Sequence, residues 1–199
     1  MRSYFTLIQS IGGIFFKFRD LLPVPIAIGL LFKARPRFWG WVFGLPIIFL
    51  GETIRVWAIM HIGPSTRTRK ISAERLVTSG PYAICRNPLY LANFLKVFGL
   101  LTIGGNLSFS IWVLVFYGVE FFTMIRYEEF YLLNRFPELF KKYCSQIPVF
   151  FPNGNLFQHS SARPPYSLRE ALLSEKCTFG STGAVLVLLA VSELRSRSK

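Results

Sequence analysis

The sequence has few of the side chains that build cysteine or metal chemistry. Its three cysteines, Cys85, Cys144 and Cys177, show no metal-ligand spacing and cannot all pair as disulfides. Its two histidines, His61 and His159, have no partners at ligand spacing, so we expect no metal site. These absences favour a reducing or bilayer-embedded setting and argue against a disulfide scaffold or cysteine-based catalysis.

Acidic side chains are also scarce. Ten Asp and Glu stand against 23 Lys and Arg, which gives a formal net charge of +13. In a soluble protein this balance would suggest a nucleic-acid partner, but here the cations lie between apolar runs and form no recognition motif. Attraction to anionic lipid headgroups explains them better. We therefore expect membrane lipids as partners and no nucleic acid.

Hydrophobic residues, in contrast, are abundant. Hydrophobic residues make up 52% of the 199 residues, and 21 residues are Phe; the mean hydropathy is +0.41. A soluble domain of this size cannot bury that much apolar surface. The composition therefore predicts an integral membrane protein. Together with the apolar runs described next, it leads us to expect an all-α membrane bundle of about four to five transmembrane helices.

Apolar runs of helical length predict where the chain crosses the membrane. The expected crossings are 21–32, which is short for a span, then Phe38–Ile62, 89–104 and 107–125. Residues 4–18 are expected to form an amphipathic surface helix. In 168–194 only residues 182–191 are strongly apolar, too few to predict a span, and we expect a helix that packs on the bundle or lies partly in the membrane. We expect an N-terminal segment 1–20, a membrane core 21–152, and a linker with a C-terminal helix 153–199.

Two charges interrupt the run Phe38–Ile62. Glu52 and Arg55 lie three residues apart on one helical face and can pair. A charge at mid-bilayer costs about 2.5–3.5 kcal/mol or more. Either the pair lies near the membrane–water boundary, or one of the two side chains faces a polar cavity.

The two later crossings form a predicted hairpin. Gly104, Gly105 and Asn106 make a tight, uncharged turn, so the loop 63–88 and the segment 126–176 share a face. Together these segments hold twelve Lys and Arg, five and seven respectively, and the positive-inside rule makes that face cytosolic. Three further cations then fall on the far side, which the rule does not predict: Lys33, Arg35 and Arg37.

Two segments on the shared face carry the polar chemistry. In 126–152 the carboxylates Glu128 and Glu129 precede apolar positions at helical spacing, and Pro137 divides the stretch into two helices that we expect to lie flat on the membrane. In 76–90, a Gly-Pro turn and Asn-Pro precede a helix start whose free N–H groups can bind a polar or anionic group. The two segments predict a polar pocket at the cytosolic membrane edge.

Residues 51–152 resemble the integral-membrane methyltransferase superfamily. The resemblance lies in the pattern GPYxxxRNPxY, followed by a helical hairpin and then by EExxLxxxFxxxxKxYxxxIPxFxP. That superfamily includes isoprenylcysteine carboxyl methyltransferases and phospholipid N-methyltransferases. The resemblance implies a pocket that takes S-adenosylmethionine from the cytosol, and a lipid or prenylated acceptor that enters from the bilayer.

Carried onto this sequence, the resemblance assigns site residues. Glu128 and Glu129 would bind the ribose hydroxyls or the ammonium group of the cofactor, and Tyr143 and Pro148 would shape a C-terminal lid. The opposite wall of the cofactor site would consist of Gly80, Pro81, Tyr82, Arg86, Asn87, Pro88 and Tyr90. Many relatives have His where Asn87 stands, so the resemblance does not assign a base to that position.

The residues leave the acceptor open. A carboxylate acceptor needs a nearby cation, for which Arg55 or Arg126 can serve; an amine acceptor needs a base, for which Glu120 or Glu129 can serve. The catalytic candidates are therefore Glu129, Arg55 and Arg126. An NADPH-dependent membrane reductase of the sterol type and a non-catalytic membrane scaffold are the alternatives. The Glu-Glu signature and the clustering of polar residues at one face favour methyl transfer over both.

Overall fold

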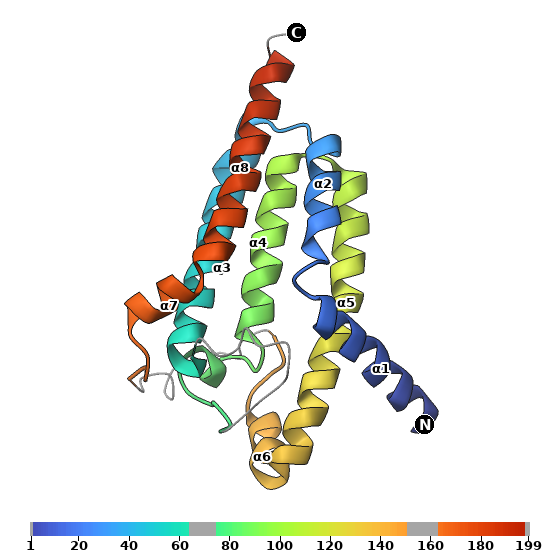
Figure 1. The fold of residues 1–199 in the computed structure, drawn as a ribbon, viewed down its shortest axis with the longest axis vertical. Coiled ribbons are helices and arrows are strands. Elements are labelled where there is room, and N and C mark those ends of the chain that lie inside the picture. Colours follow the sequence, from blue (N-terminus) through green and yellow to red (C-terminus); the bar gives the residue numbers. More distant parts are fainter. Residues whose placement is uncertain (1, 64–74, 151–162, 198–199) are drawn as a thin grey trace.

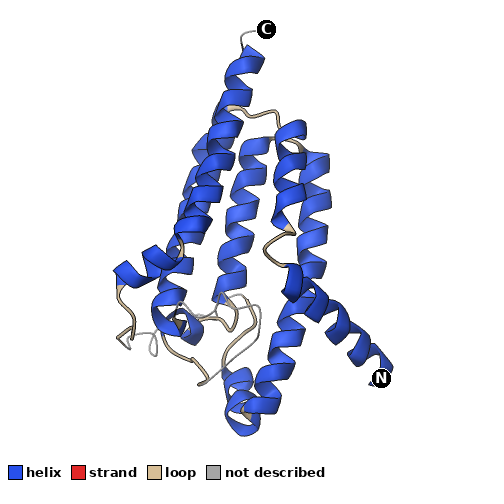
Figure 2. Ribbon diagram, in the orientation of Figure 1, coloured by secondary structure: helices blue, strands red, loops and turns tan. Residues whose placement is uncertain are grey.

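The computed structural model describes residues 2–63, 75–150 and 163–197, and every regular element in these ranges is helical (Figure 2). The all-α prediction is confirmed. Arg67, Arg69, Lys70, Pro152 and His159 lie outside the described residues. The elements are α1 (Arg2–Phe18), α2 (Pro23–Lys33), α3 (Phe38–Ile62), η2 (Gly80–Ala83), α4 (Pro88–Gly104), α5 (Leu107–Arg135), α6 (Pro137–Gln146), α7 (Leu168–Ser174) and α8 (Lys176–Arg197).

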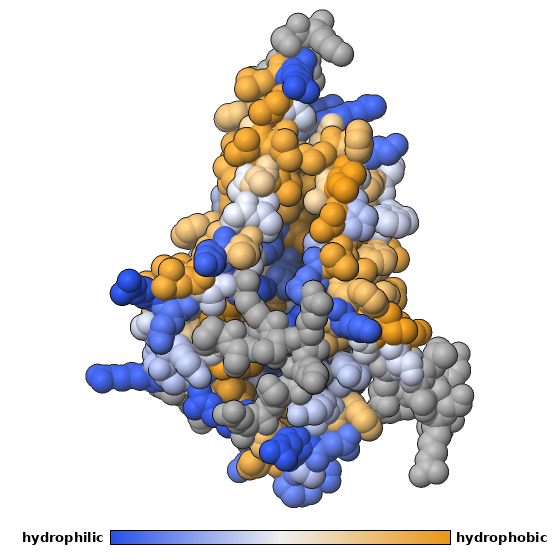
Figure 3. Space-filling model, viewed as in Figure 1, coloured by the Kyte–Doolittle hydropathy of each residue, from blue (hydrophilic) through white to orange (hydrophobic). Residues whose placement is uncertain are grey.

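Five apolar helices, α2, α3, α4, α5 and α8, run along the long axis of the molecule, while α1 leaves the bundle at an angle (Figure 1). Three segments are long and apolar enough to cross a membrane: Phe38–Ile62, Leu107–Arg135 and Lys176–Arg195. Two shorter apolar helices, Pro23–Lys33 and Pro88–Gly104, complete the set. On the face shown in Figure 3, apolar residues cover much of the bundle, and hydrophilic residues gather toward the end where α6 lies. The protein is therefore a membrane helical bundle, as predicted.

Helices α3 and α4 pack closely because glycines line their contact. A Cβ atom on Gly44 would lie 2.6 Å from the Gly99 carbonyl oxygen, and one on Gly51 would lie 2.8 Å from the Ala92 carbonyl oxygen. Small residues let helix backbones approach where lipid provides no hydrophobic drive for association. This contact fixes the start of α4 beside the end of α3.

The predicted hairpin of α4 and α5 is confirmed. Gly105 adopts φ +64°, a left-handed conformation suited to glycine, and Asn106 caps α5 by accepting a hydrogen bond from the Phe109 N–H at 3.0 Å. The Asn106 amide also donates to the Lys33 carbonyl oxygen at 3.1 Å. The open ends of the hairpin therefore lie together at the opposite end of the bundle (Figure 1).

The expectation that residues 126–152 lie flat on the membrane as two helices is wrong for the first of them. Helix α5 continues without a break through Glu128 and Glu129 to Arg135, for 29 residues. The segment 126–135 contains neither glycine nor proline, so nothing interrupts the helix begun at Leu107. Pro137 does open α6, as predicted. The paired carboxylates therefore lie on the end of a long bundle helix.

The C-terminal segment also differs from the expectation. It forms two helices, α7 and α8, and the second is long and apolar enough to span. The Thr182 hydroxyl donates to the Thr178 carbonyl oxygen at 2.9 Å, and the Ser181 hydroxyl to the same oxygen at 2.9 Å. Because these hydroxyls bond within the helix, residues 178–182 extend the apolar run instead of ending it.

Candidate functional site

Three hydrogen bonds join the two segments that the sequence analysis singled out. The Tyr143 hydroxyl of α6 donates to the Tyr82 carbonyl oxygen at 2.6 Å. The Arg86 N–H donates to the Pro148 carbonyl oxygen at 2.8 Å, and the Asn87 amide donates to the Val149 carbonyl oxygen at 3.3 Å. The turn before α4 and the chain after α6 therefore form one structural unit.

The turn itself is buried and depends on a glycine. Gly80 adopts φ +60°, and a Cβ atom there would collide with the imidazole ring of His61 at the end of α3. The His61 ring is fixed in turn, because its Nδ1 lies 3.0 Å from the Ser79 hydroxyl. Pro81, Tyr82 and the following alanine are buried with Gly80. The end of α3 thus sets the position of the turn.

Asn87 and Pro88 begin α4 as predicted, with Pro88 in its first turn. The Asn87 side chain does not cap this helix. It bonds instead to the chain after α6, so its observed role is to hold the two segments together.

The adjacent carboxylates of α5 point to different places, because consecutive helical residues are rotated by about 100°. Glu129 lies 3.3 Å from Arg86 Nη2 through one oxygen and 3.5 Å from Arg126 Nη1 through the other. Glu128 instead lies close to the Tyr90 hydroxyl of α4. Glu129 therefore belongs to the cationic side, and Glu128 to the interface between α4 and α5.

A pocket of about 330 Å³ opens beside Glu129, between α5 and α6. It combines cations at its rim with aromatic and aliphatic side chains, and Glu128 does not line it. The lining residues are Arg86, Arg126, Glu129, Phe130, Leu133, Phe140, Lys141 and Cys144.

Buried polar atoms at this junction lack hydrogen bonds. Within the described part of the chain, Arg86 Nε, Glu129 Oε1 and the Tyr82 hydroxyl are buried without a hydrogen-bond partner. Glu129 Oε1 lies 3.3 Å from Arg86 Nη2, which is close enough for an ion pair, but the two atoms do not form a hydrogen bond. Because an unpaired buried polar group costs about 1–3 kcal/mol, such a group marks a place where a ligand can bind.

Burial controls the protonation of the phenols around the turn. It raises the pKa of Tyr82 well above its usual value, and the negative charge of Glu128 raises that pKa further while the charge of Arg55 opposes it. Burial likewise raises the pKa of Tyr143. Both phenols therefore stay neutral at physiological pH and can donate hydrogen bonds. Burial also raises the pKa of the Cys85 thiol to about 11, which disfavours the reactive thiolate.

Arg55 belongs to a second polar cluster, inside the bundle. Its Nε donates to Glu175 Oε2 at 2.7 Å, and its Nη1 donates to Asn93 Oδ1 at 2.7 Å. Glu52 instead pairs with Lys96 of α4, with 3.4 Å between Nζ and Oε1. Glu52 and Arg55, which the sequence suggested could pair with each other, each have a partner from another helix.

The three catalytic candidates therefore fall in two groups. Glu129 and Arg126 flank the pocket, and the Arg126 side chain is 51% exposed. Arg55 lies in the cluster within the bundle, with its side chain 16% exposed. Tyr82 lies close enough to Arg55, and to Glu128 beside the pocket, for both charges to act on its phenol.

Sequence reasoning missed Asn93 and Glu175. Asn93 follows the Asn-Pro motif by about one and a half helical turns. It lies inside an apolar run, and its sequence neighbours gave no indication of a polar role. Glu175 lies directly before the last apolar run, and Arg55 lies in another apolar run. The lone cation could have indicated that an acidic partner such as Glu175 was needed. Pairing lone intramembrane charges of opposite sign would have found it.

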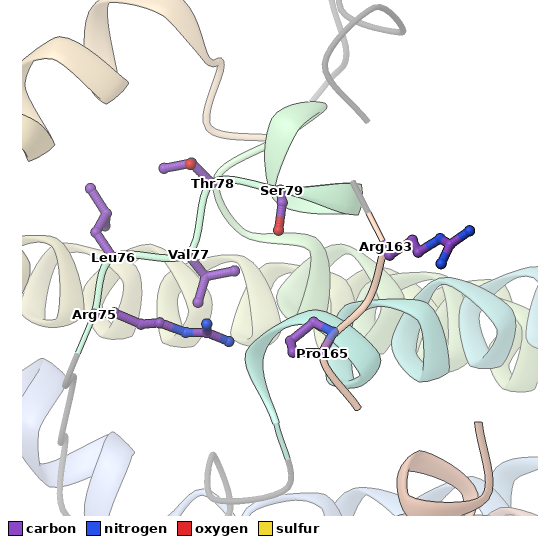
Figure 4. A pocket seen from close by; sticks show the side chains of 7 residues that line it. All are labelled: Arg75, Leu76, Val77, Thr78, Ser79, Arg163 and Pro165. Atoms are coloured by element: carbon purple, nitrogen blue, oxygen red, sulfur yellow. The ribbon is translucent and has the colours of Figure 1, made fainter. Parts of the chain in front are cut away.

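A second, more polar pocket of about 220 Å³ lies beside the chain that leads into the turn. Its lining includes Arg75, Ser79, Arg163 and Pro165 (Figure 4). The Arg163 side chain points away from the other labelled side chains, so the two guanidinium groups do not converge on one ligand.

No three His, Cys, Asp or Glu side chains come together as a metal-ion site within residues 2–63, 75–150 and 163–197. The sequence-based expectation about metal therefore stays a prediction for the whole chain.

Comparison with known proteins gives a family match and three similar relatives. The model of the isoprenylcysteine carboxyl methyltransferase (ICMT) family matches residues 43–134. Protein-S-isoprenylcysteine O-methyltransferase B of Arabidopsis thaliana is 34% identical over 133 residues, which cover 64% of this chain and 67% of the plant protein. No solved structure shows a significant match.

Two bacterial relatives carry names from metal resistance. The nickel-cobalt-cadmium resistance protein NccN of Alcaligenes xylosoxydans xylosoxydans is 32% identical over 121 residues, or 59% of this chain. The cobalt-zinc-cadmium resistance protein CzcN of Cupriavidus metallidurans is 33% identical over 119 residues, also 59% of this chain. The chain spans about half the length of these two relatives, 54% and 51% respectively.

Proposed function

The chain belongs to the isoprenylcysteine carboxyl methyltransferase family, and on that premise we propose that it transfers a methyl group from S-adenosylmethionine to the carboxylate of a lipid or lipidated acceptor. The acceptor class is the isoprenylcysteine type, as in the name of the plant relative. The observation that carries the proposal is the pocket where the two motif segments join, with its unpaired buried polar atoms.

The residues of this pocket suit the chemical groups of S-adenosylmethionine. The Glu129 carboxylate can accept hydrogen bonds from ribose hydroxyls or from the ammonium group, and Arg86 and Arg126 can bind the carboxylate. Phe130 and Phe140 offer aromatic and apolar contact for the adenine ring. When bound, the cofactor supplies an electrophilic methyl group on its sulfonium sulfur.

A carboxylate acceptor fits the remaining polar residues better than an amine. An ionised carboxylate is already a nucleophile, so the protein needs only to hold it in place and keep water away. Arg55 is the better cation for that task, because it is mostly buried among the bundle helices whereas Arg126 is half exposed. A guanidinium group binds a carboxylate through two parallel N–H groups, which also fixes its orientation.

We further infer that the site faces the cytosol. The segments that meet at the site hold the twelve Lys and Arg counted in 63–88 and 126–176, and the positive-inside rule assigns such a face to the cytosol. The cofactor would then enter from water at the hydrophilic end of the bundle (Figure 3).

Calorimetric titration of the detergent-purified protein with S-adenosylmethionine, and in parallel with NADPH, tests the proposal. We expect saturable binding of S-adenosylmethionine with a dissociation constant of roughly micromolar order, followed by transfer of a labelled methyl group to an S-prenylated N-acetylcysteine. Binding of NADPH alone would instead support the reductase alternative. Folded protein that binds neither ligand would support the scaffold alternative.

A further inference from the structure

The C-terminal helices bring a buried carboxylate to Arg55, although they lie outside the residues that match the family model, 43–134. Glu175, between α7 and α8, is fully buried, and its Oε2 lies 2.7 Å from Arg55 Nε. Removing a charge from water is costly unless a group of opposite charge lies close to it. The short distance between Glu175 and Arg55 meets this requirement. The contact is therefore a built feature of the bundle.

The guanidinium group of Arg55 is fixed from two sides. Glu175 accepts from Nε at 2.7 Å and from Nη2 at 3.4 Å, along one edge of the group, and Asn93 of α4 accepts from Nη1 at 2.7 Å. A guanidinium group has five N–H donors. Three are used, so two remain without a partner among the described residues, one on each terminal nitrogen.

The backbone at Glu175 is anchored as well. Its N–H donates to the Ala171 and Leu172 carbonyl oxygens at the end of α7, and its own carbonyl oxygen accepts from the Phe179 N–H in α8. Just before α7, the Tyr166 N–H donates to the Met60 carbonyl oxygen of α3 at 3.1 Å. The carboxylate is therefore presented to α3 from a fixed position.

We propose that Glu175 is a positioning residue for Arg55, so that the C-terminal helix pair forms part of the active site. Glu175 and Asn93 orient the guanidinium group and balance its charge, and its two remaining N–H groups hold the carboxylate of the acceptor. The inference rests on the proposed function, and it adds to the site an element beyond the family-matched residues.

A purely structural role for Glu175 makes a different prediction, because α8 has other polar links to α3. The Trp41 indole N–H donates to Glu193 Oε2 at 2.6 Å, and the Thr182 hydroxyl oxygen lies 3.4 Å from Glu52 Oε1. If the Glu175 contact served only to attach α8, loss of the Glu193 contact should have a similar effect. Glu193→Gln is therefore the matched control for Glu175→Gln.

The test measures methyl transfer to an S-prenylated N-acetylcysteine at varied acceptor concentration, with S-adenosylmethionine affinity measured separately by calorimetry. For Glu175→Gln we expect kcat/KM for the acceptor to fall by about tenfold or more, with the cofactor Kd unchanged. Glu175→Asp should recover part of that loss, since it keeps the charge, and Glu193→Gln should remain within about twofold of wild type.

The outcomes separate the inference from the function on which it rests. Wild-type kinetics in Glu175→Gln, or an equal loss in Glu193→Gln, would overturn the positioning role while methyl transfer stands. A wild-type protein that binds no S-adenosylmethionine and methylates no prenylated acceptor would overturn the proposed function and the inference together.

Discussion

Neighbouring carboxylates on one helix have separate surroundings here, and the difference can be tested residue by residue. Glu129 lies on the pocket between Arg86 and Arg126, whereas Glu128 lies close to Tyr90 of α4. Glu129→Gln removes the negative charge and keeps the shape. We expect it to weaken S-adenosylmethionine binding by about tenfold or more, measured by calorimetry, with the unfolding temperature nearly unchanged.

The matched control for that substitution is Glu138→Gln on α6. Glu138 also pairs with a cation three residues away, Lys141 at 3.2 Å, but both side chains are exposed. It should leave cofactor affinity unchanged, because an exposed pair contributes little. Equal affinities in wild type and Glu129→Gln would remove Glu129 from the cofactor site.

Tyr143 gives a pH-dependent prediction. Burial raises the pKa of its phenol above that of an unfolded tyrosine, so the folded protein retains a proton that the unfolded chain releases above about pH 10. Its contribution to stability is therefore complete below that pH and decreases as the pH rises further. The unfolding temperature of wild type should fall more between pH 8 and 10.5 than that of Tyr143→Phe.

At pH 8 the same variant tests the hydrogen bond between α6 and the turn. Tyr143→Phe leaves the Tyr82 carbonyl oxygen without its donor, which should cost about 1–3 kcal/mol of unfolding free energy. Identical pH dependence in both proteins would show that Tyr143 does not titrate differently on folding.

At the scale of elements, a single added methyl group can disturb the contact of α3 with α4. A Cβ atom on Gly99 would lie 2.6 Å from Ile48 Cγ1 and 2.7 Å from the Gly44 carbonyl oxygen. Gly99→Ala should therefore destabilise the bundle by about 1–3 kcal/mol and shift α4, which carries Asn93. Thermal unfolding in detergent measures the first effect.

Gly118 of α5 provides the control for this prediction. A Cβ atom there would meet nothing within 4 Å among the described atoms, so Gly118→Ala should be neutral or stabilise by about 0.5–1 kcal/mol through its better helix propensity. If Gly99→Ala were as stable as Gly118→Ala, close packing would not hold α3 and α4 together.

Helix limits were predictable where the sequence contains its own breaks. The Gly104–Asn106 turn and Pro137 end or begin helices where the sequence indicated. The continuation of α5 to Arg135 was not expected, because the polarity of residues 126–135 suggested a surface helix although no residue there ends one. Polarity marks the environment of a helix; only caps and breakers mark its ends.

For the molecule as a whole, the order of the helices predicts which surfaces share a side of the membrane. Leu107 begins α5 at the hairpin tip, and Ser145 lies in α6 at the other end of the bundle (Figure 1). In a cysteine-free background, Leu107→Cys and Ser145→Cys should react with a membrane-impermeant thiol reagent from opposite sides, with Ser145→Cys on the cytosolic side. Labelling of both from one side would exclude this topology.

The site was predictable only in part, because some of its residues come from segments that carry no recognisable motif. The motif segments carried Arg86 and Glu129 in recognisable order, so their meeting was expected. The partners of Arg55 come from α4 and from the C-terminal helices, and contacts between distant elements leave no local pattern in a sequence. Their assembly depends on helix packing in three dimensions.

The hydrogen bonds that join the two motif segments use the carbonyl oxygens of Pro148 and Val149, not their side chains. In evolution, apolar substitutions at Val149 should therefore be tolerated, because any residue presents the same carbonyl group and an apolar side chain keeps the packing against the core. An insertion or deletion between Tyr143 and Val149 should not be tolerated, because it would change which carbonyl group meets Arg86 and Asn87. Natural variation in this segment should thus preserve its length more strictly than its composition.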